Sequence, residues 1–210
     1  MDGVPRLSVR PRVRSAAFDT GESSDPPVPQ SGGSDTDAAV VAAQVGRAPR
    51  APWRVAARCA WGYPTAVASP SRLSDGTPFP TFAWLTCPWL YQRASAAESR
   101  SETAEWCRRA AVDDELRSRL VAADRVLRER RTVESGGRDE CESVGIAGQR
   151  DPLAVKCLHA HLALAVVGID DPIGLDLLGE GDRACPDRRC ARLAKEASSH
   201  NSDSRAKEDA

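Results

Sequence analysis

The sequence predicts an α+β domain in which a short antiparallel sheet packs against several helices, with a disordered tail at each end. All five tryptophans lie between Trp53 and Trp106, and the apolar helical patterns stop near Leu178. β-prone segments precede the helical ones along the chain, an order typical of α+β domains. The outer segments are too polar to bury a core of their own. The predicted division is a Pro/Ser/Gly-rich disordered tail at 1–52, one α+β domain at 53–180 and a polar disordered tail at 181–210.

The N-terminal segment is linker-like in composition. Residues 23–34 are rich in serine, proline and glycine, which favours an open chain over packed structure. At most a frayed helical turn is expected at Ala38–Val45. With 29 Lys and Arg against 30 Asp and Glu, the chain carries a net charge of −1. A net charge this small creates only a weak overall electrostatic field, which gives no support for nucleic-acid binding.

Three strands are expected in the first part of the domain. Arg54–Cys59 and Thr65–Ser69 are short β-prone segments, and the Gly-Tyr-Pro turn between them predicts an antiparallel pair. Phe79–Thr86 is aromatic and β-prone and predicts a third strand. Its Pro80 confines the start of that strand to an edge or to its first residues.

Helices follow the third strand. Pro88 is expected to open a helix to about Ala97, because proline suits the first helical turn, and Thr86 or Cys87 would cap it. Further helices are predicted from 101–105 onward and over Asp113–Arg131, where leucines recur at helical spacing. Residues 134–148 are polar and glycine-rich, which indicates a loop. The last predicted helices are Leu153–Val167, begun by Asp-Pro and ended by Gly168, and a short one at 175–178.

Lys156–His161 is the stretch that most strongly suggests a functional site. It contains two of the three histidines of the chain and one cysteine. On a helix, Cys157 and His161 are four residues apart and project from nearly the same side, while His159 lies at the margin of the apolar face. A buried histidine needs a partner for its ring nitrogens, which a carbonyl, a carboxylate, a thiolate or a metal would provide.

Two more cysteines fall at the ends of predicted elements: Cys59 at the end of a strand and Cys87 at a junction between a strand and a helix. If the sheet packs on the helix of 153–167, both converge with Cys157. Three thiolates with an imidazole suit zinc or an iron–sulfur cluster. The predicted metal ligands are therefore Cys59, Cys87, Cys157, His161 and His159.

Two other interpretations of these residues stay open. In the first, the cysteines are small buried hydrophobic residues and the histidines are satisfied by ordinary partners. Alternatively, a Cys87 thiolate, stabilised at a helix N-terminus, acts in a thiol-dependent enzyme with His161 or His159 as base. No acidic residue is identifiable as the group that orients the imidazole. Cys185 and Cys190 fall in the predicted tail and receive no role.

The cysteine content and the apolar segments bear on location. Seven cysteines without a recognisable secretory signal favour reduced thiols in the cytoplasm over a disulfide framework. The longest apolar segment, Leu153–Val167, is too short to span a bilayer. We therefore expect a cytoplasmic protein with no membrane partner, no nucleic-acid partner and no identifiable small-molecule substrate.

Several segments of the chain together form a specific pattern. Three of them are Phe-Pro-Thr-Phe-Ala-Trp-Leu-Thr-Cys-Pro at 79–88, Lys-Cys-Leu-His-Ala-His at 156–161 and Asp-Pro-Ile-Gly at 171–174. Arg-Cys at 58–59, Asp-Gly-Thr-Pro at 75–78 and Gly-Ile-Ala-Gly at 145–148 belong to the same pattern. These segments resemble the hallmarks of an uncharacterised bacterial family, the domain of unknown function family five hundred and one (DUF501). The resemblance spans about 53–178. The chain has Asp171 and Ala147 where members usually have asparagine and glycine.

The resemblance implies no established activity. Members are often encoded near a septum formation initiator protein, enolase and exopolyphosphatase, which suggests a protein partner in cell division or envelope growth. The motif positions that carry over are Cys59, Cys87, Cys157, His159 and His161. The leading prediction is a cytoplasmic bacterial protein with a structural or regulatory Cys/His metal site; the alternatives are the thiol-dependent enzyme and an interaction module.

Overall fold

A three-stranded sheet and a set of helices around one central helix make up the structure. It is a computed structural model that describes residues 34–50, 52–179 and 184–195. The elements are, in order, α1 (Asp35–Val45), β1 (Arg54–Arg58), β2 (Pro64–Ala68), β3 (Ala83–Leu85), α2 (Pro88–Ser99), α3 (Glu102–Val112), α4 (Asp114–Glu134), η1 (Ile146–Gly148), α5 (Leu158–Val166) and α6 (Pro172–Leu178). The predicted α+β class is confirmed.

The sheet has the strand order β1-β2-β3 with both pairs antiparallel. Arg58 pairs with Pro64 next to the connecting turn, which confirms the predicted hairpin. Ala66 of β2 pairs with Leu85 of β3, so β2 is the middle strand, and all of its residues are buried. β3 is shorter than predicted because only residues 83–85 pair with β2.

Proline and aspartate set the starts of the middle helices. α2 begins at Pro88 with Cys87 in an extended conformation at the N-cap, as predicted. The Asp113 side chain accepts a hydrogen bond from the Leu116 N–H and caps α4, a common arrangement at helix starts. The inward face of α4 carries Leu120 and Leu127, both buried.

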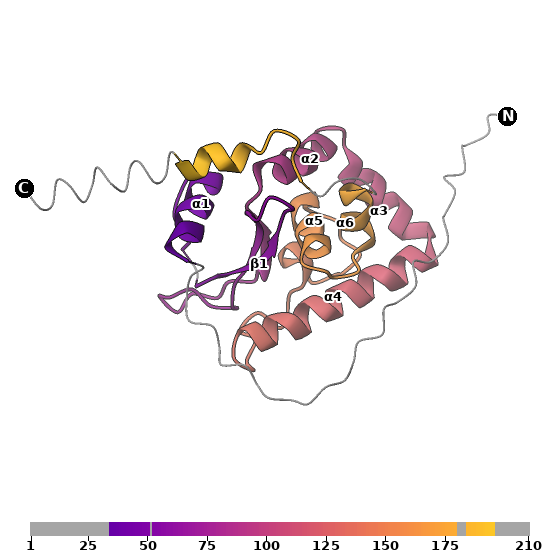
Figure 1. The fold of residues 1–210 in the computed structure, drawn as a ribbon. Coiled ribbons are helices and arrows are strands. Elements are labelled where there is room, and N and C mark those ends of the chain that lie inside the picture. The colour runs from indigo at the N-terminus through magenta and orange to yellow at the C-terminus, as the bar shows by residue number, and fades with distance from the viewer. Residues whose placement is uncertain (1–33, 51, 180–183, 196–210) are drawn as a thin grey trace, which may run out of the picture.

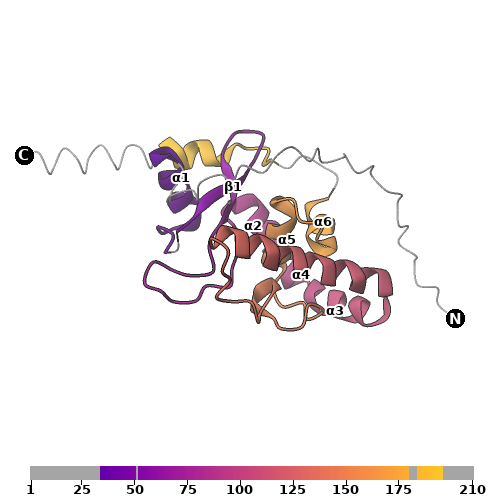
Figure 2. The same ribbon diagram turned by 90° about the horizontal axis from the view of Figure 1, so that it is seen from below.

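α5 is central and shorter than predicted. It contacts β2, β3, α2, α6 and η1 (Figures 1 and 2). The predicted helix over 153–167 is wrong at its start, because the Asp151 side chain accepts from the Leu153 N–H in a local turn and the chain then runs without helix to Cys157. Cys157 is therefore an extended N-cap residue, and its expected place on one helical face with His161 is also wrong.

α6 packs closely on α5 through a glycine. A Cβ atom built on Gly174 would lie 2.1 Å from the backbone oxygen of His161. Asp171 caps α6 by accepting a hydrogen bond of 2.7 Å from the Gly174 N–H, so the helix starts before the predicted position 175. Asp-Pro-Ile-Gly therefore combines a helix cap with a close contact between helices.

Parts of both predicted tails are ordered against the hairpin. α1 is a full helix where at most a frayed turn was expected, and an ion pair of 2.7 Å joins its Asp37 to Arg58. Residues 189–195 are helical, and this segment lies beside α1 in both ribbon views (Figures 1 and 2). The disorder predicted for these residues is wrong, because apolar side chains such as Val41 are buried there. The rest of each predicted tail lies outside the described residues.

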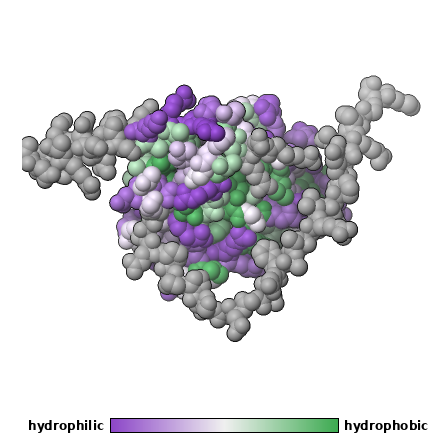
Figure 3. All heavy atoms as spheres, viewed as in Figure 1, coloured by the Kyte–Doolittle hydropathy of each residue, from purple (hydrophilic) through white to green (hydrophobic). Residues whose placement is uncertain are grey.

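The molecular surface mixes polar and apolar side chains. Figure 3 shows hydrophilic side chains spread around hydrophobic ones on the face seen in Figure 1. Within the described residues, every helix is too short or too polar to cross a membrane.

Candidate functional site

One face of α2 points three polar or aromatic side chains at His159 on α5. Tyr91, Ser95 and Glu98 are separated by four and three residues, so they share a helical face. The Tyr91 and His159 rings have centroids 4.3 Å apart. Ser95 Oγ lies 3.1 Å from His159 Nε2, and Glu98 Oε1 lies 3.2 Å from Nδ1. Both ring nitrogens therefore have a partner from α2.

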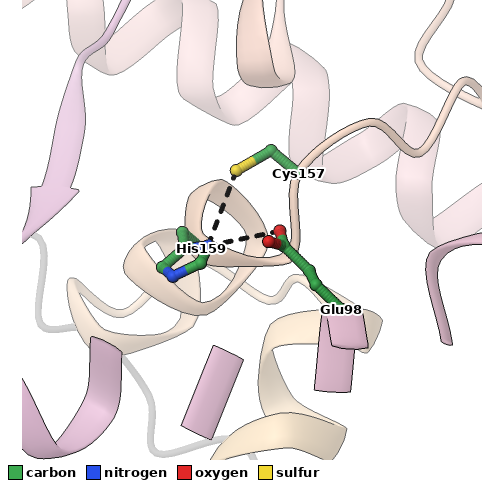
Figure 4. Close-up of side chains that lie close together, drawn as sticks. All are labelled: Glu98, Cys157 and His159. Atoms are coloured by element: carbon green, nitrogen blue, oxygen red, sulfur yellow. Dashed lines mark hydrogen bonds and ion pairs between the residues drawn. The ribbon is translucent and has the colours of Figure 1, made fainter. Parts of the chain in front are cut away.

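Cys157 completes a cluster around the same imidazole. Its Sγ lies 3.9 Å from His159 Nδ1, on the nitrogen that also faces Glu98 (Figure 4). One ligand atom from each of Glu98, Cys157 and His159 lies within 4.8 Å of the other two. Within the described residues this is the one group of three or more His, Cys, Asp and Glu side chains that meets this distance. We call it the Glu98 cluster.

The environment favours the charged forms of His159 and Glu98. A hydrogen bond to Cys157 raises the pKa of His159, partial burial lowers it, and Glu98 raises it again, with a net upward shift. Burial pushes the pKa of Glu98 up, but the Leu158 N–H and His159 outweigh this effect, so the net pKa is lowered. The Leu158 N–H donates to Glu98 Oε1 at 2.7 Å. The carboxylate is thus fixed by backbone at the start of α5.

The Glu98 cluster adjoins a cavity of about 420 Å³. Cys157, His159 and Tyr91 line one part of it, and the cationic residues of the lining are Lys156 and Arg47. Much of the remaining wall comes from apolar residues in or next to β3, α4 and α5, among them Phe82, Leu85, Leu127 and Leu164. A mainly apolar cavity with a few polar groups at one side has the character of a small-molecule site.

His161 has a different partner from His159 and lies outside the Glu98 cluster. Its side chain is buried, and Nδ1 lies 2.8 Å from Asp171 Oδ2. The other carboxylate oxygen, Oδ1, caps α6. The partner required by a buried histidine is thus a carboxylate, and it belongs to the packing between α5 and α6. The Glu98 cluster does not include His161.

Cys59 and Cys87 also lie outside the Glu98 cluster. The Cys87 side chain is 4% exposed, and burial raises the pKa of its thiol more than the Leu90 and Trp89 N–H groups lower it. The expected thiolate at this helix N-terminus is therefore opposed by burial. Of the described hydrogen bonds and ion pairs of His159 and His161, none involves Cys87. The structure thus brings together Cys157 and His159 from the predicted set.

Sequence reasoning missed Glu98, Ser95 and Asp171 as histidine partners. Glu98 lies beyond the predicted end of α2 at about Ala97, and the helix in fact continues to Ser99. The polar spacing of Tyr91, Ser95 and Glu98 along an alanine-rich helix was a usable signal. This spacing predicts that the three side chains share one face of α2, but it does not predict which element packs on that face.

Comparison with known proteins identifies one family. Residues 55–178 match the family model described as "Protein of unknown function (DUF501)". The match covers the segment 156–161, which contributes Cys157 and His159 to the Glu98 cluster, and the segment 171–174, which forms the contact between α5 and α6. No curated protein and no solved structure matches the chain.

Proposed function

The chain belongs to the DUF501 family of proteins of unknown function, and from this premise we propose that it binds one Zn²⁺ ion through Glu98, Cys157 and His159. The observation that carries the proposal is the convergence of three different ligand atoms on one point. A thiolate, an imidazole nitrogen and a carboxylate oxygen are all accepted zinc ligands, and zinc takes mixed sets of this kind.

The spacing of the ligand atoms supports this assignment. Bonds of about 2.0–2.3 Å at tetrahedral angles place zinc ligands roughly 3.3–3.7 Å apart. The Nδ1–Oε1 distance of 3.2 Å and the Sγ–Nδ1 distance of 3.9 Å bracket this range. Small side-chain adjustments are therefore sufficient for coordination.

The second contact of His159 also suits a metal ligand. Ser95 Oγ lies at Nε2, the nitrogen that stays free when Nδ1 binds the ion. Such a contact fixes the tautomer and the ring orientation of a metal-bound histidine. The Tyr91 ring packs against the same imidazole and restricts its rotation further.

Three protein ligands leave one position of a tetrahedral ion open, which is the pattern of catalytic zinc sites. The cavity beside Cys157 and His159 provides room for a water or a ligand there. A regulatory or catalytic use of the metal is thus better supported than a purely structural one. The proposal places the protein in a reducing bacterial cytoplasm, where its free cysteines stay available as ligands.

A thiol-dependent activity at Cys157 is the second candidate, because the thiol faces a histidine with a raised pKa. Against it, Glu98 and Cys157 share the Nδ1 side of the ring. In a nucleophile–base–acid arrangement, the acid binds the nitrogen opposite the nucleophile. Iodoacetamide labelling of metal-free protein separates the two: a catalytic pair predicts faster labelling of Cys157 than of the exposed Cys107, with the difference lost in His159→Gln.

Zinc analysis of the purified full chain tests the metal proposal. After dialysis against a competing chelator, Cys157→Ser and Glu98→Gln are each expected to contain one zinc equivalent less than the wild type. Cys107→Ser is the matched control, since its thiol lies outside the Glu98 cluster. Equal zinc content in the wild type and in a folded Cys157→Ser protein would overturn the proposal.

A further inference from the structure

Cys185 and Cys190 are buried and fix the C-terminal segment onto the hairpin. Each is 3% exposed. The Trp61 Nε1–H donates to the Cys185 carbonyl oxygen at 2.9 Å. The guanidinium carbon of Arg188 lies 3.8 Å from the centre of the Trp61 ring, a cation–π contact. The segment around both cysteines is therefore held against the β1–β2 turn.

Cys59 and Cys87 meet the same turn through backbone hydrogen bonds. The Cys59 N–H donates to the Tyr63 carbonyl at 3.0 Å, which closes the turn between β1 and β2. The Cys87 N–H donates to the Thr65 carbonyl at 3.3 Å. Cys59 therefore begins the segment 59–65, and Cys87, at the start of α2, is bonded to the end of that segment.

Gln44 of α1 connects the fourth cysteine to this place. Its Nε2 donates to the Pro64 carbonyl at 2.9 Å and lies 3.2 Å from the Cys190 sulfur. Pro64 is the first residue of β2 and adjoins Thr65, which binds Cys87. All four cysteines are thus within one or two hydrogen bonds of the residues 59–65, although the sequence separates Cys59 from Cys190 by most of the domain.

Burial bears on the chemistry of these thiols. Cys87, Cys185 and Cys190 are buried, and Cys59 is partly exposed. Thiolates in such a place are stable when a cation lies among them.

We propose that Cys59, Cys87, Cys185 and Cys190 bind a second Zn²⁺ ion in a closed four-thiolate site that fastens the C-terminal segment to the hairpin and to α2. The argument rests on the hydrogen bonds and the burial that place four cysteines around one turn. Four sulfur ligands without an open position are typical of structural zinc. The site shares no ligand with the Glu98 cluster and stands or falls independently of it.

Zinc binding at this place releases one proton from each thiol and leaves a local charge of −2. Arg189 immediately precedes Cys190, and its guanidinium is held by Asp187 at 3.0 Å and by Gln92 of α2 at 2.9 Å. The guanidinium therefore offsets part of the negative charge of a thiolate site.

Coordination requires the sulfurs to turn inward. Among the described residues, no three of these four sulfurs lie within 4.8 Å of one another. Turning a cysteine between staggered rotamers moves its sulfur by roughly 3 Å while the backbone stays in place, and the proposal assigns metal binding to this rotation.

Metal titration of the reduced full chain with Co²⁺ distinguishes the two sites. The wild type is expected to bind two equivalents, with an intense thiolate-to-cobalt charge-transfer band from the four-thiolate site. Cys185→Ser combined with Cys190→Ser is expected to lose that band and one equivalent. Cys157→Ser is expected to lose the other equivalent and keep most of the band. Cys107→Ser combined with Cys141→Ser is the control, with both equivalents retained.

Thiol labelling of the wild type tests the same proposal without any variant, so its result does not depend on whether a variant folds. With zinc bound, the four thiols are expected to react slowly with iodoacetamide, and a chelator is expected to speed their labelling at least tenfold, mapped by peptide mass spectrometry. Labelling rates that a chelator leaves unchanged would overturn the proposal. It would equally be overturned by a Cys185–Cys190 disulfide in the isolated protein, by stoichiometric iron with sulfide, or by unchanged metal binding in the folded Cys185/Cys190 variant.

Discussion

His161 Nδ1 lies 2.8 Å from Asp171 Oδ2 in the buried contact between α5 and α6. His159, two residues earlier, faces α2 and a cavity instead. The two histidines of one motif thus serve different parts of the molecule. His161 belongs to the packing of the fold, and His159 belongs to the candidate metal site.

Removal of the Asp171 carboxylate is expected to destabilise the fold. Asp171→Ala leaves the buried His161 without its partner and α6 without its cap, for a combined loss of roughly 2–4 kcal/mol in the free energy of unfolding. Urea denaturation measures this loss. Asp170→Ala is the matched control, because Asp170 forms an exposed pair with Arg119 and should change stability by less than about 1 kcal/mol. Equal effects of the two substitutions would contradict the structural role of Asp171.

Gly174→Ala is expected to force α5 and α6 apart. The added Cβ would lie 2.1 Å from the His161 carbonyl oxygen, so backbone must shift, at a cost of more than about 3 kcal/mol. Gly137→Ala controls for backbone conformation alone, since Gly137 has φ +94° and open space around it. That substitution should cost about 1–2 kcal/mol. Thermal unfolding of both variants would compare them, and a Gly174→Ala protein as stable as the control would contradict the close contact.

Ser95→Ala is expected to weaken zinc binding without removing a ligand. Ser95 Oγ contacts Nε2 of His159 and so orients the ring. Loss of such a contact typically lowers metal affinity by about 10–100-fold. Competition with a chromophoric chelator measures the change. Ser99→Ala, one turn further along α2, should bind zinc as the wild type does, because the Ser99 hydroxyl donates to the Ser95 carbonyl and not to His159 in the described structure.

Acid is expected to loosen α1 from the hairpin. A hydrogen bond from Arg58 lowers the pKa of Asp37 below 3.8, the ordinary value of an aspartate side chain, despite an opposing effect of burial. A lowered folded-state pKa means that the stabilisation is present above about 3.8 and is lost as pH falls through the folded value. The pair is partly exposed, so its contribution should stay below about 1 kcal/mol.

Hydrogen exchange of the α1 amides, corrected for the intrinsic pH dependence of exchange, tests this expectation. In the wild type, amide protection of α1 should decrease as the pH falls below about 4. In Asp37→Asn, protection should be lower at every pH and should show no such decrease. Asp114→Asn is the control, since its side chain is 98% exposed. A wild-type profile without the step would show that the ion pair does not hold α1 in place.

Local sequence signals predicted most of the elements. The Gly-Tyr-Pro turn gave the hairpin, Pro88 gave the start of α2, and leucine spacing gave α4. These signals act over a few residues, through proline geometry, turn chemistry and helical periodicity. The same locality explains the error at α5: Asp151-Pro152 is a good helix start in isolation, but the Asp151 side chain forms a separate turn.

The sequence by itself determined that Cys157 and His159 belong to one motif and that the chain resembles its family. Only the tertiary structure decided which partners they meet, because Glu98 is 61 residues away from His159 and reaches it through the packing of α2 on α5. The same holds for Cys185 and Cys190, whose segment is polar and was predicted to be a tail. Its burial depends on Trp61, Gln44 and the residues 59–65, and contacts over such separations leave no periodic signal in the chain.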